Sequence, residues 1–236
     1  MNTIPTPNQA KEELAKRISL VRRDMSDLLF HFTKSTADES ANSVLEKILN
    51  EGKLRGASKP KNSDKFVCFT EAPIQECNSI FSLVSIATLP EHLPRYEPYG
   101  VAVSKKWLYE QGGRHVIYDH PNARSDFSKS QLYRFAPYDP ENGKDFTWER
   151  EWRIKADELI LDPNHTLVVV PSSEEAFKIV YNYASVGIVG FEPEYSWDDG
   201  APYISGGHEV QEHNSTWLAV SLEMFGLDLK TNAVSK

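Results

Sequence analysis

The chain has 236 residues, of which 40% are hydrophobic and 11% aromatic, and its formal net charge is −8. This length fits one domain, the apolar content excludes global disorder, and the charge excludes a polycation that coats nucleic acid. Only two cysteines occur, Cys68 and Cys77, which excludes a scaffold held by several disulfides. We expect two buried thiols in a reducing cytosol, although a single disulfide is also compatible with the sequence.

The first segment has the pattern of an amphipathic helix. Thr6 and Pro7 form an N-cap and first-turn pair, and apolar residues follow at helical spacing as far as Met25. Residues 1–14 are too polar for an export signal, and the longest apolar-leaning stretch, 80–89, is about half of the ~20 residues that a membrane span needs. We therefore expect a cytoplasmic protein that does not enter the membrane.

Short strands and short helices then alternate. Gly52 stands where the first of these helices needs a left-handed cap, and Ser172 with Glu175 forms a capping box. Residues 119–144 are polar and rich in proline, which predicts a long loop. The expected strands are 28–32, 66–69, 100–103, 116–118, 148–154, 167–170 and 186–191; the expected helices are 43–50, 74–84, the helix between Ser104 and Gly112, and 173–183.

This succession lacks the regular rhythm of a doubly wound parallel sheet, and no repeat or linker divides it. We predict an α+β fold, with one mixed, mostly antiparallel sheet flanked by short helices. The expected organisation is an N-terminal helix packed on the domain (1–27), a single domain (28–227) and a frayed tail (228–236).

Several familiar motifs are missing from the sequence. It has no phosphate-binding loop, no dinucleotide fingerprint and no serine in a nucleophile elbow. His208 and His213 are five positions apart, whereas a zinc-binding helix places its two histidines four apart. We expect this segment to lie on the surface, and we predict no metal site.

Residues 146–154 combine charged and aromatic side chains. In a strand, Glu149, Glu151 and Arg153 would share one face, and Trp148 and Trp152 the other. Two carboxylates at i and i+2 lie roughly 7 Å apart, so they can bracket one bond or one sugar. An exposed strand with cross-strand Glu–Arg pairs would give the same pattern, but the tryptophans favour the wall of a half-buried cleft.

Two other strand ends carry polar residues. His31 lies near the end of a buried strand, where a lone histidine is more often a core residue than a ligand. The turn 70–73, Thr-Glu-Ala-Pro, follows the next strand, and a strand end just before a helix is a common place for binding groups.

Together, segments 31–33, 45–54, 66–73 and 149–154 resemble the ADP-ribosyltransferase superfamily. The shared layout is a His-x-Thr strand, a helix that ends Ile-Leu-x-x-Gly-x-Leu, a strand with a polar turn before proline, and a late strand with the catalytic glutamate. The layout is most similar to the bacterial toxin and phage-defence branch of DarT-type DNA-modifying enzymes, and it also resembles AbiGi-like abortive-infection proteins. The resemblance covers about 28–191.

The resemblance implies a site for NAD. Glu151 would be the catalytic glutamate, Glu149 would take the first place of a Glu-x-Glu arrangement, and His31 would face the ribose or the nicotinamide amide. The DarT branch has an arginine in the turn at 70–73, which this chain lacks, and the serine-rich strand of arginine-modifying members is also missing. The other implied NAD contacts are Thr33, Phe69, Thr70, Tyr99 and Trp152, and the candidate cations for the pyrophosphate are Lys59, Lys65, Arg114 and Arg134.

The implied activity is mono-ADP-ribosyl transfer from NAD to a nucleic-acid base or a protein side chain. The setting would be a prokaryotic toxin or anti-phage system, with a cognate toxin or antitoxin as a further partner. The alternative is a non-catalytic antitoxin, regulatory or phage-sensing protein on the same fold, and a metal-dependent hydrolase using Glu149, Glu151 and His31 is a third interpretation. The charge of −8 argues against a nucleic-acid acceptor unless a local groove forms from Lys59, Lys61, Lys65, Lys105 and Lys106.

Overall fold

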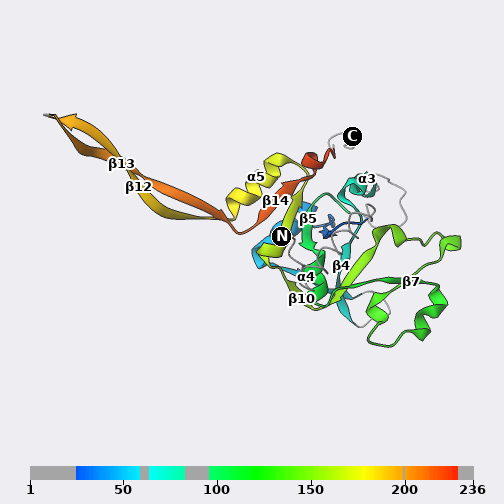
Figure 1. Cartoon of the computed structure of the whole chain (residues 1–236). Helices are drawn as coiled ribbons and strands as arrows, with labels where there is room; N and C mark the ends of the chain where they lie inside the picture. Colours follow the sequence, from blue (N-terminus) through cyan, green and yellow to red (C-terminus); the bar gives the residue numbers. More distant parts are fainter. Residues whose placement is uncertain (1–24, 59–63, 83–95, 199, 228–236) are drawn as a thin grey trace, which may run out of the picture.

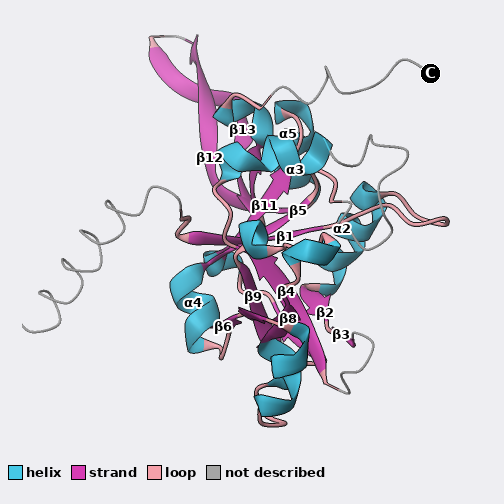
Figure 2. Ribbon diagram, turned by 90° about the vertical axis from the view of Figure 1, so that its right-hand side faces the viewer, coloured by secondary structure: helices cyan, strands magenta, loops and turns pink. Residues whose placement is uncertain are grey.

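A single large sheet forms the centre of the molecule in the computed structural model, which describes residues 25–58, 64–82, 96–198 and 200–227 (Figures 1 and 2). The strand order is β14-β11-β5-β1-β4-β9-β6, with β3 beside β4, and every pair except β11–β14 is antiparallel. The predicted α+β class with a mostly antiparallel, mixed sheet is therefore confirmed. The strands are β1 (Leu28–Phe32), β3 (Ala57–Ser58), β4 (Lys65–Thr70), β5 (Gly100–Ser104), β6 (Arg114–His115), β9 (Glu151–Lys155), β11 (Thr166–Val170) and β14 (Leu218–Ser221).

Both faces of this sheet are covered. On one face, helices α2 (Ala41–Glu51), α4 (Lys105–Glu110) and α5 (Ser173–Asn182) contribute buried residues to the larger apolar cluster. On the other face, α3 (Cys77–Ser82) and the 3-10 turn η8 (Leu222–Phe225) pack in a second cluster around Phe30 and Phe32. The sheet therefore lies between two helical layers.

The helix ends follow the sequence signals. Gly52 closes α2 in the left-handed conformation at φ 64°, the Ser104 side chain caps α4, and Ser172 with Glu175 forms the predicted capping box of α5. The predicted helix 74–84 begins instead as a 3-10 turn, η1 (Ile74–Glu76), and becomes helical only at Cys77. The predicted N-terminal helix and the tail 228–236 lie outside the described residues.

Both cysteines are free thiols, as expected. Cys77 is fully buried under the sheet, and burial, with a smaller effect of Glu76, raises its pKa to about 12. Cys68 is only half-buried, which departs from the expectation of two buried thiols.

The prediction that residues 119–144 form a long loop is wrong. It contains β8 (Phe135–Pro137), which pairs in parallel with β7 (Ile117–Asp119), and several 3-10 turns. Tyr133 and Phe135 are buried and anchor the segment on the domain. A second small sheet pairs β2 (Lys53–Arg55) with β10 (Glu158–Ile160).

The predicted strand 186–191 is part of a much longer element. β12 (Ala184–Asp198) and β13 (Ala201–Ser215) form a hairpin of two 15-residue strands that extends far from the rest of the molecule (Figure 1). We call this hairpin the arm. Among the described residues, no helix is long and apolar enough to cross a bilayer.

Candidate functional site

The centre of the sheet opens between β1 and β4. β1 pairs with β5 along its whole length, but its register with β4 contains one pair, Phe30 with Thr70. Beyond this pair the His31 ring lies between the strands, with Nδ1 2.8 Å from the carbonyl oxygen of Cys68. The His31 side chain therefore takes the place of a backbone hydrogen bond between β1 and β4, and the register of the two strands does not continue past it.

A cavity of about 60 Å³ lies at this opening. The register puts Phe30, Thr70 and Glu151 on the same face of three adjacent strands, so the cavity opens on the side of the sheet that faces α3. Its volume accommodates a few water molecules or part of one ring. The residues that line it are Phe30, His31, Phe32, Cys68, Phe69, Thr70, Tyr96, Glu149 and Glu151.

Glu149 and Glu151 reach this cavity by a route that differs from the prediction. Residues 148–154 were predicted to form one strand, but Thr147–Glu149 is a 3-10 turn and β9 begins only at Glu151. Arg150 between them has φ 45°, the left-handed conformation that non-glycine residues rarely adopt. The sharp turn, and not strand alternation, brings both carboxylates to one cavity.

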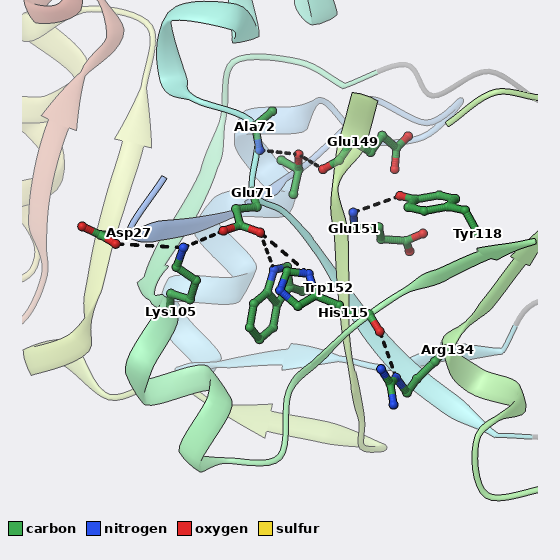
Figure 3. Close-up of polar contacts among 11 residues, drawn as sticks. Asp27, Glu71, Ala72, Lys105, His115, Tyr118, Arg134, Glu149, Glu151 and Trp152 are labelled. Atoms are coloured by element: carbon green, nitrogen blue, oxygen red, sulfur yellow. Dashed lines mark hydrogen bonds and ion pairs between the residues drawn. The ribbon is translucent and has the colours of Figure 1, made fainter. Parts of the chain in front are cut away.

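Backbone hydrogen bonds hold this turn against the end of β4. The Thr70 hydroxyl donates to the carbonyl oxygen of Glu149 at 2.6 Å, and the N–H of Glu71 donates to the same oxygen at 3.3 Å. The N–H of Glu151 donates to the hydroxyl of Tyr118 at 3.0 Å (Figure 3). Thr70 and Tyr118 therefore fix the two glutamates through their main chain.

Arg153 holds the carboxylate of Glu151 in a buried, two-pronged ion pair. Its Nε lies 2.8 Å from Oε1 and its Nη2 2.7 Å from Oε2, and Nη1 donates to the carbonyl oxygens of Tyr133 and Phe135. Burial works to lower the pKa of Arg153, but the bonds and charge of Glu151 outweigh it, so the pKa lies above its ordinary value. The two side chains share one face of β9, as predicted, but the pair is buried and lies within one strand.

His31 is held as a neutral ring. A carbonyl oxygen only accepts hydrogen bonds, so Nδ1 carries the proton toward Cys68, and Nε2 of the neutral ring is an acceptor. Burial lowers the pKa of His31 below its ordinary value, partly offset by the bond to Cys68. The residue can therefore accept a hydrogen bond from a hydroxyl or amide group.

Two acidic side chains line the cavity, and Arg153 balances the charge of one of them, Glu151. Glu149 and Glu151 are both buried, and the lining, taken over the described residues, includes no lysine or arginine. Burial, followed by the charges of these two glutamates, raises the pKa of Tyr96 well above its ordinary value. Burial also raises the pKa of Tyr118, and the two carboxylates add to this effect. Such a lining favours a cationic group, or a group that becomes cationic.

Three of the residues predicted to contact NAD, Thr33, Tyr99 and Trp152, do not line the cavity. The Thr33 hydroxyl is 2.9 Å and 3.0 Å from the carbonyl oxygens of Ala41 and Tyr99, which ties the end of β1 to α2. The Tyr99 hydroxyl donates to Glu175 of the α5 capping box. Phe69 lines the cavity, but its ring belongs to the larger core cluster and meets His31 edge-on at 5.8 Å.

The third, Trp152, points to the opposite face of β9, where it belongs to a separate polar network around Glu71 (Figure 3). Glu71 is fully buried; its carboxylate accepts from Trp152 Nε1 at 2.9 Å and from Lys105 Nζ at 2.5 Å. The rings of His115 and Trp152 are tilted by 46° with their centroids 4.0 Å apart, and His115 Nδ1 lies 3.8 Å from Oε2 of Glu71. This network links the polar turn after β4 to α4 and β6.

The candidate cations for a pyrophosphate are not at the cavity. Lys65 pairs with Asp157, Arg114 lies over the ring of Tyr109, and Arg134 donates to the carbonyl oxygen of His115. Lys59 lies outside the described residues, as does Lys61 of the expected basic groove. Lys105 of that groove is taken up by Glu71.

Sequence reasoning missed Tyr96, Tyr118 and the role of Arg153. Arg153 carried a signal, because its position two residues after Glu151 gives a shared strand face and opposite charge. Tyr96 and Tyr118 are separated from the glutamates by more than thirty residues, and nothing in their local sequence distinguishes them from other tyrosines.

Comparison with protein-family models, with curated proteins and with solved structures found no match to this chain.

Proposed function

We propose that the protein is a mono-ADP-ribosyltransferase that uses NAD and modifies a macromolecular acceptor. One observation carries the proposal: Glu149, Glu151 and the neutral His31 line a single cavity where the central sheet opens. His31 lies more than a hundred positions before the two glutamates in the sequence. These three residues are the ones to which the family resemblance assigns catalysis and NAD binding.

The chemistry of this reaction matches the charge of the cavity. The bond between C1′ of the ribose and the ring nitrogen of nicotinamide breaks, and nicotinamide leaves with the electron pair. The sugar then carries positive charge, which a nearby carboxylate stabilises. Glu151, which Arg153 holds in place, is assigned this role.

Glu149 is assigned the role of the base. A new bond forms between C1′ and a nitrogen or oxygen of the acceptor, whose proton passes to the Glu149 carboxylate. His31 would accept a hydrogen bond at Nε2 from a ribose hydroxyl or the carboxamide NH₂. At about 60 Å³ the cavity can take only part of the nicotinamide end, so the pyrophosphate would bind outside it.

The test is to incubate the full chain with labelled NAD and cell lysate and to measure both label transfer and nicotinamide release. We expect Glu149→Gln and Glu151→Gln to reduce each signal by about 10²–10⁴-fold, because each removes a group that acts in the transition state. Glu110→Gln, at the exposed end of α4, is the matched control and should be fully active. A wild-type protein that neither transfers label nor releases nicotinamide would show that the proposal is wrong.

A second candidate function, a non-catalytic antitoxin, regulatory or phage-sensing protein, has a specific observation in its favour. Arg153 neutralises the carboxylate of Glu151, and no cation of the described chain lines the cavity. Expression in a bacterial host separates the two functions. Toxicity that Glu151→Gln relieves indicates the enzyme, whereas a non-toxic protein that co-purifies stoichiometrically with one partner indicates the binding protein.

A further inference from the structure

The arm is a two-stranded ribbon that pairs with no other strand of the described chain. At a rise of about 3.3 Å per residue, its 15-residue strands reach roughly 50 Å. A lone hairpin is at best marginally stable in water, and three or more strands or a packed face are needed to stabilise it. A ribbon of this length therefore requires a surface that covers it.

The outer half of the arm has two chemically distinct faces. Along β12 the odd positions Phe191, Pro193, Tyr195 and Trp197 share one face, opposite Ile204 and Pro202 of β13. The even positions Glu192, Glu194 and Asp198 share the other face. Phe191, Tyr195, Trp197 and Ile204 are 58–73% exposed, so the apolar face is open to solvent.

One aromatic ring of this face packs across the two strands of the arm. The ring of Phe191 crosses to β13 and lies over Gly207, where a Cβ would come within 2.3 Å of the ring. Aromatic cover of a glycine on the neighbouring strand is a recognised way to fix strand register. The aromatic side chains therefore form a defined surface along the ribbon.

Exposed apolar side chains are concentrated near this surface. Within the part of the chain that the structure describes, fifteen large hydrophobic residues are exposed, and twelve of them lie between Phe177 and Phe225. They include Phe177 and Tyr181 on α5, whose rings stack at 6.3 Å, and Leu218 on β14, the edge strand of the central sheet. Exposed apolar side chains therefore occur both on the arm and on α5 and β14 of the domain.

We propose that the apolar face of the arm is covered by a second copy of this chain, in a dimer built from the two arms. With aromatic side chains that bury 150–250 Å² each, the face offers about 500 Å² per copy. Two copies together approach the lower limit of about 1,200 Å² for a stable interface. A patch of this size matches the largest apolar patch of a typical monomer, and such patches often serve as interaction sites.

Charge favours a second copy over other occupants. Residues 184–215 contain six acidic residues and no lysine or arginine, which disfavours nucleic acid and anionic membranes. When two apolar faces meet, Glu192, Glu194 and Asp198 point outward into solvent, and the acidic residue on the apolar face itself is Glu209, the cross-strand partner of Phe191. A symmetric, self-complementary contact of this kind is the usual form of a homodimer.

Sedimentation velocity of the full chain over a hundredfold range of concentration tests this proposal. Two neighbouring substitutions form a matched pair, because they introduce the same charge on opposite faces of β12: Tyr195→Glu on the apolar face and Ser196→Glu on the acidic face. We expect a wild-type dimer, at least about tenfold weaker dimerisation for Tyr195→Glu, and little change for Ser196→Glu. Circular dichroism shows that both variants are folded.

Three results would overturn the proposal. A wild-type chain that is monomeric throughout the concentration range is one, including the case in which it binds a different protein through the arm. Equal weakening by both substitutions is the second, because it would mean that the apolar face is not specifically used. Unchanged dimerisation in Tyr195→Glu is the third, because the dimer would then use another surface.

Discussion

The ion pair between Arg153 and Glu151 is the residue-scale feature on which the cavity depends. Both side chains are more than nine-tenths buried, and the guanidinium also bonds two carbonyl oxygens. Arg153→Met leaves the carboxylate without its cation, so we expect it to reduce the free energy of unfolding by about 3–5 kcal/mol. Urea unfolding measures this loss.

Two companion variants distinguish the pair from an ordinary salt bridge. Arg153→Met/Glu151→Met removes both charges and should be closer to wild type than Arg153→Met alone. Arg55→Met breaks the exposed pair with Glu51 and should cost at most about 1 kcal/mol. If Arg153→Met costs no more than Arg55→Met, the carboxylate of Glu151 does not depend on Arg153.

His31 gives the molecule a defined pH dependence. Its pKa is lower in the folded state than the ordinary 6.5, mainly through burial, so the unfolded state takes up the proton first as the pH falls. The stability is therefore fully present above pH 6.5 and is lost as the pH falls from there toward the folded-state pKa. His115 acts in the same direction, because burial lowers its pKa as well.

We expect His31→Gln to flatten this dependence without abolishing it. The amide can still donate to the carbonyl oxygen of Cys68, but it does not titrate, and His115 is retained. Thermal unfolding at a series of pH values between about 5 and 7.5 measures the slope. An unchanged slope in His31→Gln would contradict the assignment of His31 as a ring that stays neutral in the folded protein.

At the scale of elements, β1 and β5 approach so closely that only glycine fits at one position. A Cβ on Gly100 would lie 2.2 Å from the carbonyl oxygen of His31 and 2.9 Å from the Cα of Phe32. Gly100→Ala must therefore move β1, which we expect to cost about 1–3 kcal/mol and to displace His31 from the cavity.

The matched control is Gly187→Ala, where a Cβ meets nothing within 4 Å. It should change the free energy of unfolding by no more than about 0.5 kcal/mol in the same urea titration. If both substitutions have equal effects, the contact between β1 and β5 is looser than these distances imply.

Elements with a strong local pattern were predictable, and those fixed by tertiary contacts were not. The apolar runs of β1, β4, β5 and β11 and the caps of α2 and α5 agree with the prediction. Residues 147–150 read as a strand by alternation, but bonds from Thr70 and Glu71 to the Glu149 carbonyl stabilise a turn instead. The pairing of Glu149 with Glu151 was predicted from their spacing, but their grouping with His31 came from the family resemblance, because His31 lies more than a hundred positions away.

The full length of the arm was also missed. Its strands are rich in glycine and acidic residues, which are poor strand formers, and only 186–191 has a continuous apolar run. Pairing of the two strands over fourteen registered positions overrides this weak propensity. The local sequence therefore indicated the inner end of β12 alone.

For the whole molecule, the position of the arm changes the meaning of the net charge. Six acidic residues of 184–215 account for six of the eight excess negative charges, so the other 204 residues carry a formal charge of only −2. The sequence-level objection to a nucleic-acid acceptor rested on −8 for the entire chain. Most of that charge lies on the arm, which projects away from the cavity. It is therefore not an argument against a nucleic-acid acceptor in the proposed reaction.

The domain and the arm should also be separable in folding. Among the side chains of β12 and β13 that the structure describes, none belongs to either apolar core cluster, and Ser185 and Asn214 are paired across the base of the hairpin. We therefore expect a chain in which an Asn-Gly turn replaces residues 186–213 to fold with a melting temperature within about 4 °C of the wild-type monomer. Differential scanning calorimetry measures this.

The same shortened chain separates the two proposals made above. It should be monomeric, because it lacks the proposed dimer surface, and it should keep the nicotinamide release of the wild type, because the cavity residues are all outside the arm. A shortened chain that is unfolded would show that the arm stabilises the domain. A folded, monomeric chain without activity would instead indicate that the reaction requires the dimer, even though each cavity is complete within one chain.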